Sequence, residues 1–221
     1  MIAKDLINYM IPPLKTGDDL DKARIWMDEL RLSELPVADQ GEFLGLLTEE
    51  AVLDAGYDAA LVKDVPLEAQ EAVVDHDQHY YELLKTAYSL GVRMVAVSDD
   101  SGHYIGVVSV EDVVEAFASS SSIQTPGAIL ILTMNQRDYS LSEISKIVEN
   151  DDSMILSSHV LPHPEEVGKV QVTIKINKEE VTHLSAILDA RGYKVYKAYS
   201  KAEISENDQD RFDSFMRYLK V

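Results

Sequence analysis

The residues best placed to do chemistry in this 221-residue chain lie at one predicted strand end, Ile-Gly-Val-Val-Ser-Val-Glu-Asp at residues 105–112. Two apolar residues follow Gly106, and the hydroxyl of Ser109 stands three residues before the carboxylate of Asp112. A hydroxyl at the end of a strand can cap the helix that follows, and a carboxylate three residues later points back to the same place. The pattern therefore predicts a small polar site where a buried strand ends and a helix begins.

A near copy of this stretch stands earlier in the chain, at residues 44–51. It keeps the glycine, as Gly45, and a hydroxyl, as Thr48, but has Ala51 where the later copy has its carboxylate. One site should therefore be complete, and the other should lack its carboxylate. Helix capping alone is the competing interpretation, because any junction between a strand and a helix can use such residues.

Histidines and carboxylates gather at residues 75–79, Asp-His-Asp-Gln-His, and both types of side chain bind zinc or manganese. When the two repeats described below are aligned, this segment falls on residues 15–19, which contain no histidine. Asp77 then takes the place of Asp18, which we expect to cap the first long helix. We therefore expect no metal site.

No arrangement in the sequence indicates catalysis. His159 and His163 stand at a predicted strand end without a serine or cysteine nucleophile in an identifiable motif beside them. The sequence also contains no P-loop and no Gly-x-Gly-x-x-Gly turn. We therefore expect a protein that is not an enzyme, with no catalytic residues and no required cofactor.

The composition narrows the choice of partners. The chain carries 39 acidic and 20 basic residues, so its formal net charge is −19. Nucleic acids and anionic membranes should be repelled, because binding to either uses lysine or arginine against phosphate. The chain has no cysteine, no apolar run long enough to span a bilayer, and no signal-peptide core after Met1. We therefore expect a cytoplasmic protein that binds neither nucleic acid nor membrane.

The elements that position the strand-end sites form a tandem repeat. Residues 4–6 match residues 63–65, and residues 35–39 match residues 95–99. Each repeat should contain an extended segment, an amphipathic helix, two strands joined by a polar turn, and a second helix. Neither repeat can bury its apolar face alone, so the two should pack as a pseudo-symmetric pair. The expected elements are residues 20–32, 35–38 and 43–47 in the first repeat and residues 80–90, 94–98, 104–108 and 110–118 in the second.

These residues resemble the tandem CBS domain, also called a Bateman module, over roughly residues 1–118. The resemblance lies in the order Leu-Pro-Val-x-Asp, a turn, Gly, two apolar residues, Thr or Ser, two residues and Asp, which recurs in the second repeat with substitutions. It implies that the repeats face each other and that clefts between them bind adenosine compounds such as AMP, ADP, ATP or S-adenosylmethionine. It also implies that Ser109 contacts phosphate and that Asp112 contacts the ribose hydroxyls.

The resemblance assigns further residues. Apolar groups of the strands clamp the base in that family, which implies this role for Ala72, Val74 and Val95. The first repeat departs from the pattern at Ala51, so the cleft that carries Thr48 should be degenerate. We therefore expect at most one good nucleotide site in each chain.

A change of composition separates the repeats from a second domain. Residues 119–127 are rich in serine and end in Pro-Gly, which is typical of a flexible linker. The apolar pattern after it predicts the order βαββαβ, a ferredoxin-like arrangement. Ser140 and Glu143 should form a capping box at the first helix of this domain. The strands are expected at residues 128–134, 154–161, 169–176 and 193–199, and the helices at residues 140–149, 179–190 and 203–219.

This order, with Asp138 just before the first helix, resembles an ACT domain, a family that senses amino acids or other small ligands and usually pairs its sheets between chains. ACT ligand sites commonly have a glycine at the first turn from strand to helix, whereas residues 135–139 contain none. A CBS pair followed by an ACT-like domain resembles the acetoin utilisation protein family, whose members are thought of as regulatory. The resemblance implies a homodimer.

We therefore expect an α+β protein with CBS repeats at residues 1–59 and 60–118, a linker at residues 119–127, and a ferredoxin-like ACT-like domain with a C-terminal helix at residues 128–221. Its expected function is non-catalytic regulation by an adenine nucleotide or related adenosine ligand. Two alternatives stay open: a ligand-free module for dimerisation or partner binding, and amino-acid sensing through the ACT-like domain. The expected ligand-binding residues are Ser109, Asp112, Ala72, Val74, Val95 and Thr48.

Overall fold

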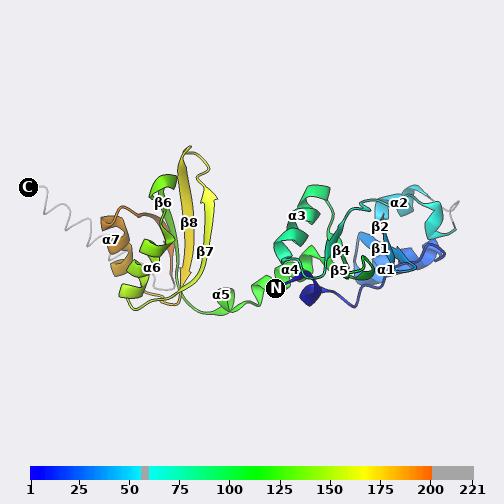
Figure 1. Cartoon of the computed structure of the whole chain (residues 1–221), viewed down its shortest axis with the longest axis horizontal. Coiled ribbons are helices and arrows are strands. Elements are labelled where there is room, and N and C mark those ends of the chain that lie inside the picture. Colours follow the sequence, from blue (N-terminus) through cyan, green and yellow to red (C-terminus); the bar gives the residue numbers. More distant parts are fainter. Residues whose placement is uncertain (56–59, 201–221) are drawn as a thin grey trace, which may run out of the picture. The chain divides into compact units, whose positions relative to one another are not determined.

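The computed structural model describes residues 1–55 and 60–200, which belong to two compact units. Unit 1 is Met1–Ala118 and unit 2 begins at Ser119 (Figure 1). The helix expected at residues 203–219 lies outside the described residues.

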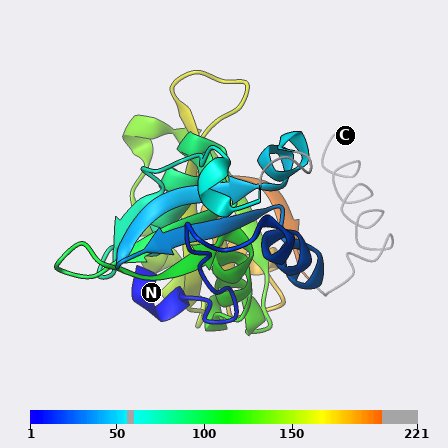
Figure 2. The ribbon, with the colours of Figure 1, turned by 90° about the vertical axis from the view of Figure 1, so that its right-hand side faces the viewer.

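Unit 1 contains the two repeats, each with the expected order of elements. In the first, β1 pairs with β2 in an antiparallel manner, and Figure 2 shows these strands side by side in blue. In the second, β4 lies between the antiparallel β5 and the parallel β3. The first repeat consists of η1 (Ala3–Leu6), α1 (Leu20–Leu30), β1 (Glu34–Asp39), β2 (Glu42–Thr48) and α2 (Glu49–Asp54). The second consists of η2 (Val62–Asp64), β3 (Val73–Asp75), α3 (Tyr80–Leu90), β4 (Met94–Ser98), β5 (Tyr104–Ser109) and α4 (Val110–Ala118).

The two repeats exchange their opening segments. Ala3 and Leu6, which come before the first repeat's own helix, are buried in the core of the second repeat beside Val95 and Val108. Val62 and Val65, which open the second repeat, are buried in the core of the first. The backbone repeats the exchange, since the N–H of Ala3 donates to the carbonyl of Gln78 and that of Val62 donates to Asp18. Each core is therefore completed by a segment from the other repeat. The exchange stabilises the pair because it removes these apolar side chains from water.

The caps of the long helices differ from the prediction. We expected Asp18 and Asp77, but α1 is capped by Asp19 and α3 by His79, one and two residues later. Asp18 accepts from the backbone N–H of Lys15 instead and pairs with Lys22. A sequence of adjacent acidic residues predicts that a cap is present but does not fix which residue has the extended backbone that capping requires.

A buried carboxylate joins the repeats near the start of β1. The Oε1 atom of Glu34, a residue only 7% exposed, accepts a hydrogen bond of 2.6 Å from the backbone N–H of Arg93 in the second repeat. Burial raises the pKa of Glu34 above its usual value, because the ionised carboxyl loses its hydration, and the nearby Arg93 offsets part of the rise. The ionised form of this carboxyl therefore costs stability.

The raised pKa of Glu34 predicts a pH-dependent effect of Glu34→Gln. The stability that a raised pKa contributes is complete below the unfolded-state pKa, about pH 4, and is lost as the pH rises through the folded-state pKa. The amide of glutamine keeps an acceptor for Arg93 and has no charge to bury. We therefore expect the variant to gain free energy of unfolding relative to the wild type between about pH 4 and pH 7. Urea unfolding across this range measures the difference, and a constant difference would contradict the prediction.

Unit 2 is an antiparallel sheet with two helices on one face, as Figure 1 shows. Its strand order, β7-β8-β6-β9, places the first and third strands of the domain at the centre, as in a ferredoxin-like fold. Leu130 and Leu132 of β6 pack with Ile144 of α6 and Leu184 of α7 in one buried core. The elements are α5 (Ser121–Gln124), β6 (Ile129–Asn135), η3 (Gln136–Asp138), α6 (Leu141–Asn150), β7 (Ile155–Pro162), β8 (Lys169–Ile176), α7 (Thr182–Ala190) and β9 (Lys194–Tyr199).

Two local predictions for unit 2 need correction. The linker contains the single turn of helix α5, although its serine-rich composition predicted no regular structure. Ser140 caps α6 as expected, since its hydroxyl accepts from the N–H of Glu143 at 3.4 Å. The Glu143 carboxylate instead accepts a hydrogen bond from the hydroxyl of Tyr193, so the reciprocal bond of a capping box is replaced by a contact between α6 and the segment before β9. The α+β class and the ferredoxin-like order are confirmed.

Candidate functional site

The predicted strand-end site brings Ser109 and Asp112 together at the junction of β5 and α4. The Ser109 hydroxyl donates to Asp112 Oδ2 at 2.6 Å, and the backbone N–H of Ser109 donates to the same oxygen at 2.8 Å. The N–H of Asp112 donates back to the Ser109 hydroxyl at 3.0 Å. Ser109 is buried and Asp112 is half-buried. The pair is therefore a reciprocal helix cap, and one carboxylate oxygen, Oδ1, points away from it.

The opening segment of the first repeat supplies the partner of that oxygen. The side-chain amide of Asn8 donates to Asp112 Oδ1 at 2.8 Å. The backbone N–H of Asn8 also donates to the carbonyl of Val107, which anchors this segment against β5. Asp112 is thus hydrogen-bonded through both oxygens, and the bond to Asn8 is the one that a ligand would have to replace or share.

The glycine of the motif has a structural role at this point. A methyl group on Gly106 would lie 2.4 Å from Cγ2 of Ile7, which is too close for any real contact. The group that approaches the backbone at this glycine is Ile7 of the other repeat. Gly106 therefore permits the segment of residues 7–8 to lie over the strand that leads to Ser109.

The first repeat has the same arrangement with different polar groups. Thr48 caps α2 by accepting from the N–H of Ala51 at 3.2 Å, and its hydroxyl donates to the carboxylate of Glu68 at 3.4 Å. Glu68 occupies the position of Asn8, since its backbone N–H donates to Leu46 as that of Asn8 donates to Val107. Because residue 51 is alanine, the only carboxylate that hydrogen-bonds to the Thr48 side chain among the described residues is that of Glu68, on the segment that crosses the site.

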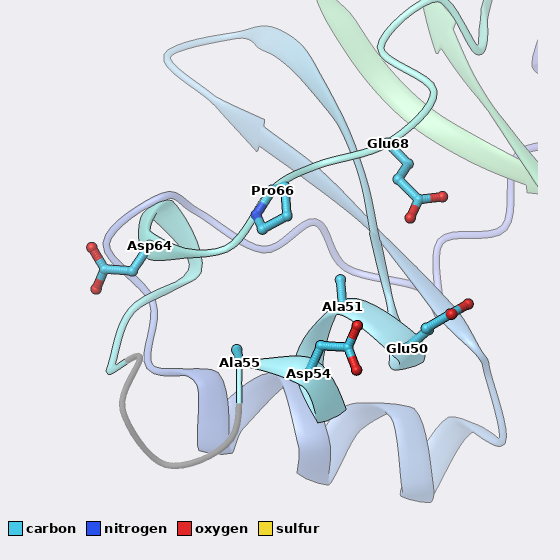
Figure 3. A pocket seen from close by; sticks show the side chains of 7 residues that line it. All are labelled: Glu50, Ala51, Asp54, Ala55, Asp64, Pro66 and Glu68. Carbon is cyan, nitrogen blue, oxygen red and sulfur yellow. The ribbon is translucent and has the colours of Figure 1, made fainter.

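A depression of about 640 Å³ lies beside the Thr48 site. Figure 3 shows that its residues come from α2 and from the crossing segment opposite. Four of the seven side chains are carboxylates and none is basic, so the local charge opposes binding of phosphate. The lining residues are Glu50, Ala51, Asp54, Ala55, Asp64, Pro66 and Glu68.

The other predicted ligand residues are inside the protein. Ala72 and Val95 are 0% and 1% exposed, and Val74 is 6% exposed. Val74 and Val95 belong to the buried core of the second repeat. Their assignment as a base clamp stays a prediction, and a base would reach them only through a movement of the groups that cover them.

A second depression of unit 1 carries basic residues. It has a volume of about 360 Å³ and lies between the end of α1, the helix α2 and the turn before β4. Arg24, Arg31 and Arg93 line it together with the carboxylates Asp28 and Glu49. The Arg93 carbonyl accepts a hydrogen bond from the N–H of Val110, the first residue of α4. Arg93 therefore lies next to the start of the helix that Ser109 caps.

The histidines considered in the sequence as metal ligands or catalytic groups include three whose surroundings the structure describes in detail. Within residues 1–55 and 60–200, no group of three or more His, Asp or Glu side chains could hold a metal ion. His79 caps α3, and Nδ1 of His163 accepts from the backbone N–H groups of Glu165 and Glu166 in the β7–β8 turn. His159 is exposed on β7. None of the helices among the described residues is long and apolar enough to cross a membrane.

Asn8 is the residue at the site that sequence analysis missed. The match of residues 4–6 to residues 63–65 showed that an opening segment recurs, but it gave no sign that each segment crosses to the other repeat. Comparison of the repeats did not single out Asn8 either, because the residue at the corresponding position of the second repeat is of a different type, Glu68.

Comparison with known proteins bears on the second repeat. Residues 62–119 match the family model of the CBS domain. This range includes β3 to α4 and therefore Ser109 and Asp112. The match points to no catalytic family.

Solved structures, some of them described as CBS domain pairs, are also similar to part of this chain. One is a CBS domain pair/ACT domain protein from Thermotoga maritima, with 22% identity and a TM-score of 0.47 over 53% of this chain and 96% of that chain. Another is CBSX2 in complex with AMP, with 18% identity and a TM-score of 0.45 over 52% of this chain and 95% of that chain. A third is a CBS domain pair in complex with 5′-methylthioadenosine and S-adenosyl-L-methionine, with 18% identity and a TM-score of 0.42 over 53% and 96%.

The bond between Asn8 and Asp112 predicts coupling between the first residues of the chain and α4. Asn8→Ala and Asp112→Ala should each lower the free energy of unfolding by about 1–2 kcal/mol, because each leaves a partner unpaired. The loss of free energy of unfolding in the double variant should be smaller than the sum of the two single losses by about 1 kcal/mol. Chemical unfolding of the four proteins measures this coupling, and strictly additive losses would show that the bond has no energetic weight.

Proposed function

We propose that the chain is a non-catalytic regulatory protein that binds an adenosine-containing ligand at the junction of β5 and α4. The single observation that carries the proposal is the placement of Ser109 and Asp112, within a CBS-matching range, at the end of a buried strand. A hydroxyl and a carboxylate side by side provide acceptors for a ribose diol and, once the Ser109 hydroxyl turns from Asp112 to the ligand, a donor for phosphate. The backbone N–H groups at the start of α4 add a partial positive charge for an anion.

The hydrogen bond between Asn8 and Asp112 links ligand binding to the opening segment of the chain. A ribose hydroxyl that donates to Asp112 Oδ1 takes the place of Asn8 or shares the oxygen with it. Because Asn8 is anchored to Val107 and follows the exchanged turn η1, a change at this bond reaches the segment whose Ala3 and Leu6 complete the core of the second repeat. The ligand then acts through its different affinity for the two positions of this segment.

The test is calorimetric titration with AMP, ADP, ATP and S-adenosylmethionine. We expect at least one of them to bind with a stoichiometry of one for each chain, and Asp112→Ala to weaken that ligand by about tenfold or more, because a hydrogen bond to a charged group is lost. The matched control is Glu111→Ala, which removes the same charge from an exposed neighbour on the same helix turn. Circular dichroism of each variant checks that α4 is intact.

Two outcomes of this titration would remove the proposal. Failure of all four compounds to bind the wild type would do so, as would a ligand whose affinity is the same for Asp112→Ala and the wild type. Equal weakening by Glu111→Ala would show that only the net charge of the helix matters.

The ligand-free alternative has one observation in its favour. Both oxygens of Asp112 already have hydrogen-bond partners within the chain, so the residue is satisfied as a cap and as a tie between the repeats. In that case unit 1 is a dimerisation or partner-binding module. None of the four compounds should then bind, while Asp112→Ala should still destabilise the protein.

Amino-acid sensing through unit 2 also has a specific site. A depression of about 510 Å³ lies at the turn between β6 and α6, where the N–H of Gln136 donates to the carbonyl of Gly168. The turn itself has no glycine, but Gly168 of the β7–β8 turn brings a backbone without a side chain to this place. A thermal shift with an amino acid that persists in Asp112→Ala would support this function, and no shift with any of the common amino acids would oppose it.

A further inference from the structure

The four strands that the structure describes within residues 119–200 carry no acidic residue, although the chain as a whole has a net charge of −19. The ten acidic residues between 119 and 200 all lie in helices, turns or loops. The strands contain four lysines, Lys169 and Lys175 on β8 and Lys194 and Lys197 on β9. Positive charge on the sheet is therefore separated from the negative charge of the same unit.

The strand register places these lysines on one face. Leu130 and Leu132 of β6 point into the core with the helices. Ile129, Ile131 and Thr133 alternate with them along the strand and are therefore on the opposite face. Paired residues of neighbouring strands share a face, and Lys175, Lys197 and Lys194 pair with Ile129, Ile131 and Thr133 respectively. A bulge at Tyr196 keeps both lysines of β9 on this face. We call this surface, away from α6 and α7, the open face.

The two lysines of the edge strand β9 form no salt bridge among the described residues, although the charge of Lys194 helps to lower the pKa of Glu166. Lys169 pairs with Glu166 at 2.5 Å, and Lys175 donates to the carbonyl of Ile123. No ion pair joins Lys194 or Lys197 to any residue that the structure describes. Lys197 lies over the ring of Tyr199 at 4.7 Å, and its strand is exposed. Their charges are available to an external partner.

One polar group beneath these lysines also lacks a partner. Thr133 is 8% exposed, pairs in register with Lys194 and Gln171, and its hydroxyl has no hydrogen bond within the described residues. An unsatisfied buried hydroxyl is uncommon, because it loses its hydration without return. The open face therefore has lysines without a salt bridge on its edge strand β9 and an unpaired hydroxyl on the neighbouring central strand β6.

The acidic residues of the protein are concentrated in the other unit. Residues 1–118 contain 24 acidic and 8 basic side chains, whereas residues 119–221 contain 15 and 12. When two copies meet, contact between two copies of residues 1–118 is opposed by like charge, and contact between those residues and the open face is favoured. Such a contact can form twice about a twofold axis, which closes the assembly as a dimer.

We propose that the open face docks on the acidic surface of residues 1–118 of a second copy, in a reciprocal dimer. The contact is between lysine ammonium groups and carboxylates, so salt weakens it. A strand of nucleic acid is a different occupant of the same surface. A complex with nucleic acid is less favoured than the dimer, because phosphates on the open face would be repelled by the net negative charge of the protein.

Carbodiimide crosslinking tests which copy supplies the carboxylates. The reagent joins a lysine amine to a carboxylate as an amide and takes up the water that is lost, so it marks only ion pairs in contact. The sample is an equal mixture of unlabelled and 15N-labelled full-length chains. We expect mixed-isotope crosslinks from Lys194 and Lys197 to aspartates or glutamates of residues 1–118. Crosslinks of these lysines only within one chain, or none, would overturn the proposal.

Sedimentation of full-length variants gives an independent measurement. Lys194→Glu and Lys197→Glu should each weaken the dimer by about tenfold, because one reversed charge acts in both contacts of the pair. The control is Lys146→Glu, which makes the same charge change on an exposed position of α6, the opposite side of the sheet. An effect as large in Lys146→Glu, or none in the two β9 variants, would contradict the proposal.

The same measurement distinguishes the remaining occupants. The wild-type dimer should dissociate as NaCl rises from about 0.05 M to about 0.5 M, since the contact is screened within a few ångströms at the higher value. A protein that is monomeric throughout this range would overturn the proposal. So would labelled single-stranded RNA that binds the wild type and loses binding in Lys197→Glu while the oligomeric state stays unchanged.

Discussion

The exchange of opening segments between the two repeats is the interaction on which unit 1 depends. Ala3 and Leu6 fill the core of the second repeat, and Val62 and Val65 fill that of the first. Burial of this kind contributes about 1.5–3 kcal/mol for each large apolar side chain. Neither repeat has a complete core without the other. The strand-end site inherits this dependence, because the segment that supplies Asn8 is the continuation of the exchanged turn.

Much of this fold is predictable from the sequence, for reasons that are local. α3, β4 and α4 have the predicted bounds, because helical spacing of apolar residues and polar turns at each end leave little choice. The order βαββαβ follows from the same patterns. The single turn α5 is not predictable in this way, because it is too short to have a period and depends on contacts with the sheet, such as that of Lys175 with Ile123.

The candidate site is predictable only in part. Spacing alone is enough to bring Ser109 and Asp112 together, since the side chain of the third residue of a helix reaches back to the residue that caps the helix. The bond from Asn8 joins residues 104 positions apart, and no local pattern encodes it. The capping residues Asp19 and His79 show a smaller limit, because among adjacent polar residues the backbone conformation decides which one acts.

Pseudo-symmetry between the repeats has a consequence for how the two strand-end sites came to differ. Two separate copies of a single repeat, exchanging the same segments, would form a symmetric dimer in which every substitution appears at both sites. Joining the repeats in one chain removes that restriction. The residues at positions 51 and 112, and those at positions 68 and 8, can then change independently. One junction can keep a specialised polar site while the other is bordered by carboxylates. Covalent duplication thus allows a twofold scaffold to hold an asymmetric pair of surfaces.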